Sequence, residues 1–584
     1  MKLNFIDCEG FCNHIFFLRK MRGDKMDISL KIAIGTIIVL SLIIIKGVLD
    51  NRKYKKNLYA RLKNTFGQPS REEYSEELMQ KISYYFRAVT KEGDIDDITC
   101  NDIDLDKIYQ RLNCTRTSIG EEYLYALLRR PFLDVDELDE RERVIQIMSD
   151  NEEERIQLQT ALEKIGKVRS LSVYENFESV DDMNSQSKIY HILCALALLV
   201  SGALCFVTPA MAAILAVVVV FNVITYFQKK VLLDSYVQLF SFVIRLSENA
   251  IDIAKIKIPG IEEYQKKLIT SARKLKKLGK NSWLISGATL SGDLLDSLMD
   301  YVRMLFHVDL IKLCSMVSEI KKYKKELAAV YEIIGFIDSM ISIAAYRYSL
   351  EAWCIPEFDL TGDRYRMEVS EIYHPLIDEP VKNSIDVDSC VLLTGSNASG
   401  KSTFIRTIAI NAIFAQTIHT VLADNYRARL FYIYSSMALR DDIFSNESYY
   451  MVEIKSLKRI IDMVQKSKAD ILCCIDEVLR GTNTLERIAS SAQVLKSLCD
   501  MGATCFAATH DIELTRILKQ YYENYHFEEQ VCDNDVHFDY KLRDGNAKTR
   551  NAIKLLNMIG YDKKIVEDAE GMVQAFLDTG MWSL

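Results

Sequence analysis

The sequence predicts an α+α/β fold, in which a long helical region with transmembrane helices precedes a C-terminal P-loop α/β domain. Three observations support this fold class. Proline accounts for 7 of the 584 residues, about 1% against an average of about 5%, and this scarcity favours long helices. Two apolar runs are longer than a soluble core requires. A glycine-rich loop directly follows an apolar strand in the last third of the chain.

Composition limits the classes of protein to which the chain can belong. At 584 residues it is too long for a single hydrophobic core, so several domains are expected. With 49% hydrophobic and 26% charged residues, it is neither disordered nor collagen-like. A net charge of -8 excludes a globally basic nucleic-acid binder, although not a local basic patch. The 14 cysteines follow no disulfide-framework spacing, which is typical of a reducing cytosol.

The first apolar run predicts a transmembrane helix over residues 28–49. Its uninterrupted apolar part covers residues 32–45, and Lys31 and Lys46 near its ends could extend their ammonium groups to the membrane surface. No small-residue cleavage site follows the run, which favours a signal anchor over a cleaved peptide. A helix buried in a soluble domain is the alternative interpretation.

Basic residues on both sides of this run leave its orientation open. Residues 52–56 contain four of them, which favours a cytoplasmic C-terminal side, whereas the four in residues 19–25 favour the opposite orientation. The conflict disappears if translation begins at Met26. In that case most of the N-terminal extension, residues 1–27, is a start-site artefact.

The second apolar run predicts a transmembrane hairpin over residues 189–228, which contain no charged residue. Pro209 lies at its middle, so we expect helices over residues 189–207 and 210–227 with a turn at Thr208-Pro209. Basic residues flank the run on both sides: Lys188, Lys229 and Lys230. Both ends are therefore expected on the cytoplasmic side. A re-entrant or buried hairpin is the alternative.

A phosphate-binding loop is predicted after the apolar strand Val391–Thr394. The sequence GSNASGKST matches the pattern G-x-x-x-x-G-K-[ST], and an apolar-periodic helix follows over residues 404–415. Backbone N–H groups of such a loop surround phosphates at a helix N-terminus. Lys401 would bind the β- and γ-phosphates of ATP, and Ser402 would ligate Mg²⁺. The predicted nucleotide-binding residues are Gly395, Ser396, Asn397, Ala398, Ser399, Gly400, Lys401, Ser402 and Thr403.

Two further strands carry candidate catalytic residues at their carboxyl ends. The apolar run 471–475 ends in Asp476 and Glu477, the arrangement of a Walker B motif. Asp476 would hold the Mg²⁺ shell and Glu477 would orient or deprotonate the attacking water. The strand 503–508 is followed by His510, which could sense the γ-phosphate. The alternatives are an acidic helix N-cap for the carboxylate pair and a structural histidine.

Taken in order, these motifs resemble those of the MutS family of ATPases. That family has Asn at the third P-loop position, a Ser-rich segment ending in Met-Val-Glu, then Asp-Glu-x-x-Arg-Gly-Thr and Ala-Thr-His. The corresponding segments here begin at Gly395, Ser445, Asp476 and Phe506, and His374-Pro375 is similar to the family's His-Pro segment. The departures are Ser396 and Ala398-Ser399 in the loop, and Glu486-Arg487 where the family usually has Asp-Gly. The resemblance covers about residues 370–572.

The resemblance implies a P-loop, ABC-type ATPase domain and a dimer. In this family the Ser-rich segment of one subunit completes the other subunit's nucleotide site, which makes Ser445 and Ser448 the candidates to act in trans. An ordinary helix N-cap is their alternative role. A homodimer through the ATPase domain is therefore implied, with Arg480 to Asn483 facing its seam.

Upstream segments resemble the core and lever helices of the family, beginning with Asn113 to Gly120. No mismatch-recognition domain is expected within residues 50–100, and the DNA clamp of the lever is not found either. The expected organisation is an N-terminal extension (1–27), a transmembrane helix (28–49), a core helical region (50–188), a transmembrane hairpin (189–228), lever helices (229–355) and an ATPase domain with C-terminal dimerisation helices (356–584).

These expectations combine into one leading function and one alternative. The first is a membrane-anchored, MutS-like ATPase that binds and hydrolyses ATP with Mg²⁺ in a dimer and couples this to lever movement. DNA, including mismatched DNA, is implied as a partner by the resemblance alone, and basic pairs within residues 266–277 could contact phosphates. The alternative is an ATP-driven membrane-remodelling or transport-associated ATPase that does not bind DNA. Either would be a multi-pass protein of the cell membrane with its ATPase domain in the cytoplasm.

Overall fold

The computed structural model divides the chain into two compact units, residues 1–65 and 66–584. It describes residues 28–69, 72–180, 187–276, 294–360, 366–396, 399–437, 449–480, 482–532, 535–546, 553, 556 and 559–582. The N-terminal extension that the sequence predicts over residues 1–27 lies outside this set, so the start at Met26 stays a prediction.

The described part of the first unit is one helix, α2 (Ile28–Asn64). The predicted span 28–49 forms its first 22 residues, about 33 Å at 1.5 Å per residue, which is long enough to cross a hydrocarbon core of about 30 Å. Large apolar side chains along this stretch are exposed: Ile37, Ile38, Val39, Leu42, Ile45, Val48 and Leu49. Exposed apolar side chains in this number are typical of a surface that contacts lipid or another protein.

Short capped helices begin the second unit. Polar side chains accept backbone N–H groups at several of their N-termini, as Asp96 does for α5 and Thr117 for α7. The helices are α3 (Glu76–Ile82), α4 (Tyr84–Val89), α5 (Asp97–Asp102), α6 (Leu105–Leu112), α7 (Ser118–Leu128), α8 (Val135–Asp150), α9 (Glu152–Ile165) and α10 (Val173–Ser179).

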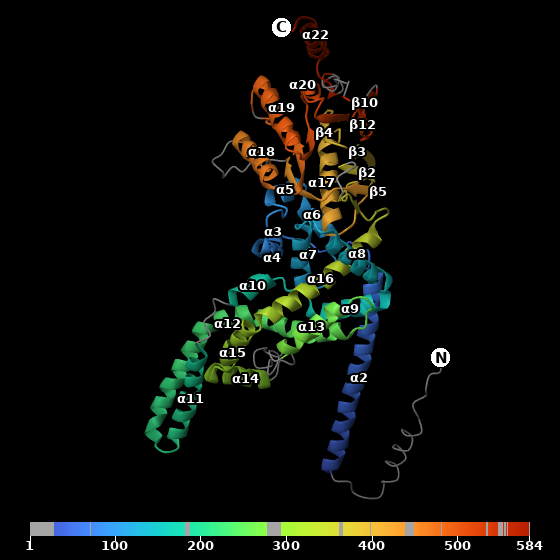
Figure 1. Cartoon of the computed structure of the whole chain (residues 1–584). Helices are drawn as coiled ribbons and strands as arrows, with labels where there is room; N and C mark the ends of the chain where they lie inside the picture. Colours follow the sequence, from blue (N-terminus) through green and yellow to red (C-terminus); the bar gives the residue numbers. More distant parts are fainter. Residues whose placement is uncertain are drawn as a thin grey trace, which may run out of the picture. The chain divides into compact units, whose positions relative to one another are not determined.

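A helical hairpin follows, formed by α11 (Ser187–Cys205) and α12 (Ala212–Lys255), with the short 3₁₀ helix η2 (Pro209–Met211) between them. The turn lies where Pro209 was expected to place it, because proline fits the first position of a helix. The second helix does not end at Phe227, however. It continues for 28 residues to Lys255, since no glycine or proline interrupts that stretch. Figure 1 shows the hairpin extending from the rest of this unit.

Three helices among the described residues are long and apolar enough to cross a membrane, judged by length and composition. In the two hairpin segments, Lys188–Cys205 and Pro209–Lys229, only 22% and 17% of the residues are buried. In the third, Lys324–Ser349, 83% are buried. Most of the apolar surface of the hairpin is therefore not covered by other described residues, whereas the third helix is a core helix.

The remaining helices connect the hairpin to the sheets: α13 (Glu262–Leu275), α14 (Leu294–Phe306), α15 (Val308–Lys322) and α16 (Lys324–Ser349). Helix α16 packs closely on α7. The buried carboxylate of Asp338 accepts hydrogen bonds from the backbone and hydroxyl of Thr117 at 2.9 and 2.7 Å. Glycines keep the helices close: a Cβ at Gly335 would lie 2.7 Å from Cβ of Tyr123, and one at Gly120 would lie 2.2 Å from Asp338.

The α/β part contains a six-stranded sheet among the described residues, with the order β12-β9-β4-β8-β7-β6. All neighbouring pairs are parallel except β12 with β9. A four-stranded sheet of order β1-β5-β2-β3 and the hairpin β10-β11 accompany it. The strands are β1 (Glu357–Phe358), β2 (Met367–Ile372), β3 (Asn383–Val387), β4 (Cys390–Thr394), β5 (Asn425–Ala428), β6 (Phe431–Ser436), β7 (Asp470–Asp476), β8 (Thr504–Ala508), β9 (Tyr522–His526), β10 (Glu529–Cys532), β11 (Asp535–Phe538) and β12 (Arg543–Asp544).

Helices cover both faces of the large sheet (Figure 1). Val391 and Leu393 of β4 share a core with α17, whereas Cys390 and Leu392 share one with α18 and α19, because alternate side chains of a strand point to opposite faces. The helices are α17 (Lys401–Thr417), α18 (Tyr449–Lys466), α19 (Thr484–Asp500), α20 (Ile512–Ile517) and α22 (Lys563–Thr579). The predicted α+α/β class is therefore confirmed. Of the predicted transmembrane helices, the two of the hairpin are candidates by length and composition, and α2 is not among the three helices so identified.

Candidate functional site

Three adjacent parallel strands bring the predicted motifs to one edge of the sheet. Strand β8 lies between β4 and β7. Thr394 ends β4 before the glycine-rich loop, Asp476 ends β7, and Ala508 ends β8 two residues before His510. Parallel strands place their carboxyl ends at the same edge, where open α/β sheets bind ligands. The structure therefore places Lys401, Asp476, Glu477 and His510 around one cavity.

Glycine is required at both ends of the phosphate-binding loop. Gly395 has a φ of 147°, and a Cβ there would lie 2.8 Å from the carbonyl oxygen of Phe527. Gly400 has a φ of 111°, a conformation that L side chains rarely adopt. Helix α17 begins at the next residue, so its N-terminal N–H groups are directed at this loop. Asn397 and Ala398, which the sequence assigns to nucleotide binding, lie outside the described residues.

The side chain of Lys401 is buried at the base of the loop. Its Nζ donates hydrogen bonds to the carbonyl oxygens of Gly395 at 2.9 Å and Ser396 at 2.7 Å. Burial lowers the pKa of Lys401, while the nearby carboxylates of Asp476 and Glu477 oppose that shift. A buried ammonium group beside a helix N-terminus is suited to bind phosphate oxygens.

Glu477 lies just beyond β7 in a left-handed backbone conformation, with a φ of 60°. Its N–H donates to the carbonyl oxygen of Ala508 at 3.0 Å, which ties the ends of β7 and β8 together. One carboxylate oxygen lies 2.7 Å from Nε2 of His510, and the other lies 2.6 Å from Nε of Arg480. The hydrogen bond from His510 is the main cause that lowers the pKa of Glu477, and Arg480 adds to it.

Arg480 links Asp476 and Glu477, at the end of β7, to helix α18. Its guanidinium donates to the carbonyl oxygen of Asp476 at 2.9 Å, and its own N–H donates to the carboxylate of Glu453 at 3.1 Å. Glu453 is buried, and burial raises its pKa. It belongs to the Met-Val-Glu end of the Ser-rich segment. That segment itself, with Ser445 and Ser448, lies outside the described residues, and so does Gly481.

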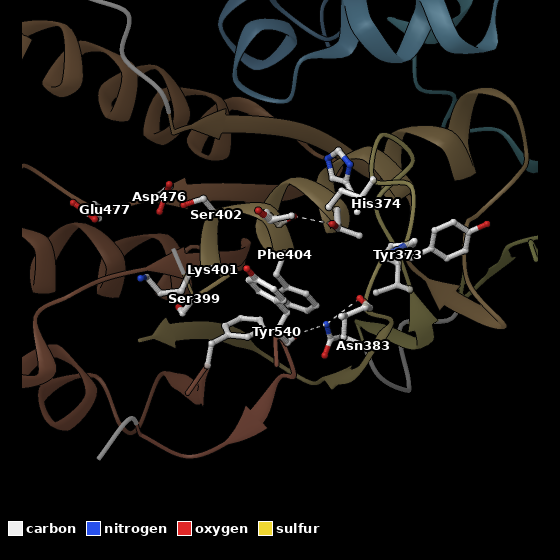
Figure 2. A pocket seen from close by; sticks show the side chains of 18 of the residues that line it. Tyr373, His374, Asn383, Ser399, Lys401, Ser402, Phe404, Asp476, Glu477 and Tyr540 are labelled. Carbon is white, nitrogen blue, oxygen red and sulfur yellow. Dashed lines mark hydrogen bonds between the residues drawn. The ribbon is translucent and has the colours of Figure 1, made fainter. Parts of the chain in front are cut away.

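The cavity has a volume of about 590 Å³ and extends well beyond the loop. Figure 2 shows Asp476 and Glu477 at one end and Tyr373 and Asn383 at the other. Tyr373, His374 and Asn383 line the far wall. Phe404, Phe527 and Tyr540 line the cavity beside the loop, where a Cβ at Gly400 would lie 3.2 Å from the Tyr540 ring and 3.9 Å from the Phe527 ring. Of these six residues the sequence predicted only His374, because the lining combines segments that lie far apart along the chain. Tyr540 directly precedes the Lys541–Gly545 segment, which lies within the region of family resemblance, so its position next to that segment could have indicated that it lies near the site.

His374 and Asn383 fix the shape of this far wall. Burial lowers the pKa of His374 to about 4, with Arg406 contributing, so its imidazole is neutral at pH 7. Its Nδ1 accepts the N–H of Leu376 at 3.2 Å. The side chain of Asn383 donates to the carbonyl oxygen of Tyr540 at 3.0 Å and accepts the N–H of Leu542 at 2.8 Å. These bonds hold the loop of Tyr540 against the cavity.

The donor set of the cavity fits a magnesium nucleotide. The hydroxyl of Ser402 and the carboxylate of Asp476 both line it, and these are the oxygen donors that Mg²⁺ prefers when phosphates supply further ligands. The hydroxyl oxygen of Ser399 is buried with no hydrogen-bond partner among the residues that the structure describes. An unpartnered buried hydroxyl in the loop is suited to contact a phosphate oxygen.

Comparison with known proteins supports the assignment of this part of the chain. Residues 391–577 match the family model described as MutS domain V. The human MutS protein homolog 4 is 29% identical over 309 residues, covering 50% of this chain and 32% of that protein. The DNA mismatch repair protein MutS of Aquifex pyrophilus is 28% identical over 253 residues, covering 41% of this chain and 29% of its own length. That of Pseudothermotoga lettingae is 32% identical over 251 residues, covering 41% and 30%.

The chain therefore spans about a third of the length of the curated relatives that it matches. The similarity supports an ATP-binding, MutS-like function for the α/β part of the chain.

Proposed function

We propose that the protein is a membrane-associated, MutS-like ATPase that binds and hydrolyses ATP in a dimer and couples hydrolysis to movement of its helices. The observation that carries this proposal is the convergence of Lys401, Ser402, Asp476, Glu477 and His510 on one cavity. Each of these side chains has the chemistry that phosphoryl transfer requires, and the relatives match the chain in this region.

The proposed roles follow from where each side chain lies. Lys401 at the base of the loop binds the β- and γ-phosphates of ATP. The hydroxyl of Ser402 and the carboxylate of Asp476 hold Mg²⁺, which supplies electrostatic stabilisation of the transferred phosphoryl group. Glu477 orients the attacking water. Because its pKa is lowered, it stays ionised at neutral pH and is a weak base, which favours orientation of the water over its full deprotonation.

The rest of the cavity would hold the base and sugar of the nucleotide. Aromatic side chains of Phe404, Phe527 and Tyr540 offer faces for stacking, and Asn383 keeps the Tyr540 loop in place. At 590 Å³ the cavity falls within the size range of sites that bury a small organic ligand.

We infer that the second subunit completes the site. The Ser-rich segment with Ser445 and Ser448 connects β6 to α18, and α18 carries Glu453 against the Arg480 loop. A serine that reaches the nucleotide of a partner would make hydrolysis depend on dimer formation. Exposed apolar residues in the C-terminal helix α22 and directly after it, such as Ile565 and Met581, offer a surface that a partner could cover.

Membrane association is inferred from the apolar surfaces of α2 and of the α11–α12 hairpin. Large apolar side chains near the tip of the hairpin are exposed, including Phe206 at 95% and Val207 at 75%. A surface of this kind is unfavourable in water and stable in lipid. We propose a multi-pass arrangement with the ATPase part in the cytoplasm.

The alternative is an ATP-driven membrane-remodelling or transport-associated ATPase that does not bind DNA. One observation favours it. Lys274, in the basic stretch that could contact DNA phosphates, lies 2.8 Å from the carboxylate of Glu326, which reduces the positive charge of that face. DNA binding is implied by the relatives' names alone, and we keep it as a question for experiment.

Two measurements on the purified full chain in detergent test the proposal. The first is Mg²⁺-dependent phosphate release at several protein concentrations. A dimeric ATPase predicts that the specific activity rises with protein concentration, and no phosphate release above that of Lys401→Ala would contradict the proposal.

The second measurement is a titration of fluorescent homoduplex and mismatched DNA, with and without ATP, at low and physiological salt. Salt-sensitive, nucleotide-modulated binding supports a DNA partner, and no binding at low salt supports the alternative.

A further inference from the structure

The edge strand of the large sheet is held by a helix of the N-terminal helical region. Among the strands that the structure describes, β6 pairs only with β7, so its other edge carries backbone groups without a described strand partner. Helix α5 supplies partners at the carboxyl end of this edge. The N–H of Ser435 donates to the hydroxyl of Thr99 at 3.1 Å, and the N–H of Met437 donates to the carboxylate of Asp102 at 2.9 Å.

Asp102 makes the stronger of these contacts. It is 2% exposed, and the same carboxylate oxygen also accepts the hydroxyl of Ser435 at 2.6 Å. Charge-assisted hydrogen bonds of this length are about twice as strong as neutral ones. Removal of the carboxylate would leave the Ser435 hydroxyl and the Met437 N–H without this acceptor, which destabilises the contact of α5 with the end of β6. Met437 is the last described residue before the segment 438–448.

Asp96 makes the corresponding contact on the other side of that segment. One of its carboxylate oxygens caps α5 by accepting the N–H of Thr99 at 2.8 Å, and the other accepts the guanidinium of Arg459 in α18. Arg459 also donates to the carbonyl oxygen of Ser435. Helix α5 therefore binds both elements that flank the segment carrying Ser445 and Ser448.

Helix α5 is also bonded to the helices that lead away from the ATPase part. The guanidinium of Arg129 donates to the carboxylate of Asp97 in α5 at 2.7 Å and to the carbonyl oxygen of Ile95, which lies just before that helix. Arg129 ends helix α7, whose first turn is bonded through Thr117 to Asp338 of α16. A continuous series of hydrogen bonds therefore runs from the end of β6, through α5 and α7, to α16.

We propose that Asp96 and Asp102 are positioning residues that transmit the nucleotide state of the site to α7 and α16 through helix α5. This inference rests on the proposed function. Arg480 joins Glu477 to Glu453 of α18, and Arg459 of the same helix donates to Asp96, so a shift of α18 on nucleotide binding is carried to α5. Loss of either carboxylate weakens the attachment of α5 to β6 or α18 without changing the groups that bind ATP.

The test is hydrogen exchange of backbone amides, measured by mass spectrometry on the full chain in detergent, with and without a non-hydrolysable ATP analogue. Three variants are compared with the wild type. Asp102→Ala removes both contacts with β6, Asp102→Asn retains one carbonyl acceptor for them, and Thr99→Val removes one bond at nearly constant volume. The matched control is Asp94→Ala, since Asp94 is a buried carboxylate in the same region that pairs with Arg130.

In the wild type, the analogue is expected to change exchange in peptides of α7 and α16. Asp102→Ala and Thr99→Val should reduce that change by at least about fivefold, a typical size of coupling between sites, while analogue affinity stays the same. Asp102→Asn and Asp94→Ala should retain it. A purely structural role would instead raise exchange equally in both nucleotide states.

Three outcomes separate this inference from the proposed function. If Asp102→Ala and Thr99→Val, each still folded at the assay temperature, keep the full nucleotide-dependent change, the inference is wrong. If the wild type binds the analogue and α7 and α16 do not respond, the inference is wrong and the proposed ATPase still stands. If the wild type does not bind the analogue at all, the proposed function fails and this inference fails with it.

Discussion

Nε2 of His510 lies 2.7 Å from one carboxylate oxygen of Glu477, while Nε of Arg480 lies 2.6 Å from the other. Both oxygens of the side chain that should orient water are therefore engaged by neighbouring donors. Each oxygen keeps a further lone pair, so the carboxylate can still accept a water molecule, while the two donors limit the directions from which that water can approach. Arg480 also joins this carboxylate to α18, so a shift of α18 would change the geometry around Glu477.

Replacement of Glu477 by glutamine should abolish turnover and leave nucleotide binding intact. The amide cannot accept a proton from water or hold it in the same way, so kcat should fall by about 100-fold or more, whereas the affinity for ATP should change little. Phosphate release and equilibrium binding of an ATP analogue measure the two effects. Glu486→Gln is the matched control, because Glu486 is an exposed carboxylate of the following helix. Equal activity of both variants would remove Glu477 from the mechanism.

Removal of His510 should move the acid limb of the pH–rate profile. The hydrogen bond from His510 is the main cause of the lowered pKa of Glu477, so in His510→Ala that pKa should rise toward its ordinary value. Glu477 must be ionised to act, so activity should be lost at a higher pH than in the wild type. The profile of kcat/KM between pH 4 and 8, approximately the range over which carboxylates titrate, provides the measurement. An unchanged acid limb would show that another group controls it.

Glu122 should make the stability of the helical region fall as pH rises. Its carboxyl group is fully buried, and burial raises its pKa from 4.5 to about 7 in the folded protein. The folded state therefore retains a proton that the unfolded state has already lost. The stabilising contribution is complete below the ordinary pKa and is lost as pH rises through about 7, at a cost of about 1–3 kcal/mol.

The measurement for Glu122 is the melting temperature at several pH values in the wild type and in Glu122→Gln. The glutamine variant loses one acceptor for the N–H of Tyr174 and should be less stable at low pH. Its melting temperature should nevertheless fall less between pH 5 and 8, since it has no proton to lose there. Parallel curves for the two proteins would contradict the raised pKa.

The close approach of α16 to α7 should not tolerate a methyl group. In Gly335→Ala the new Cβ would lie 2.7 Å from Cβ of Tyr123, so the helices must separate, at a cost of about 1–3 kcal/mol. Gly571→Ala in α22 is the matched control, because a Cβ there meets no atom within 4 Å. That control should be neutral or slightly stabilising, since alanine is the better helix former. Thermal unfolding of both variants gives the comparison, and equal melting temperatures would be the contrary result.

The motifs at the sheet edge could be predicted from the sequence because each one is local. A strand, a glycine-rich loop and a helix occupy consecutive residues around Lys401, and the acidic pair directly follows its own strand. These residues could be assigned to the site without knowing the order of the strands in the sheet. The bounds of β7 and β8 agree with the expected runs to within one residue.

Other features could not be predicted because they depend on contacts between distant segments. The lining of the cavity combines Tyr373, Asn383, Phe404 and Tyr540, which no sequence spacing brings together. The contacts of α5 with β6 join residues more than 300 positions apart, as for Asp102 and Ser435. The length of α12 was missed for a different reason: the apolar run ends at Phe227, but the helix continues as an amphipathic one.

The most direct test of the central claim is equilibrium binding of a fluorescent ATP analogue to the purified full chain and to Lys401→Ala, with and without Mg²⁺. The account predicts saturable, Mg²⁺-dependent binding that weakens by at least about tenfold, or about 1.4 kcal/mol, when the buried ammonium group is removed. Equal binding by the two proteins, or none by the wild type, would contradict it.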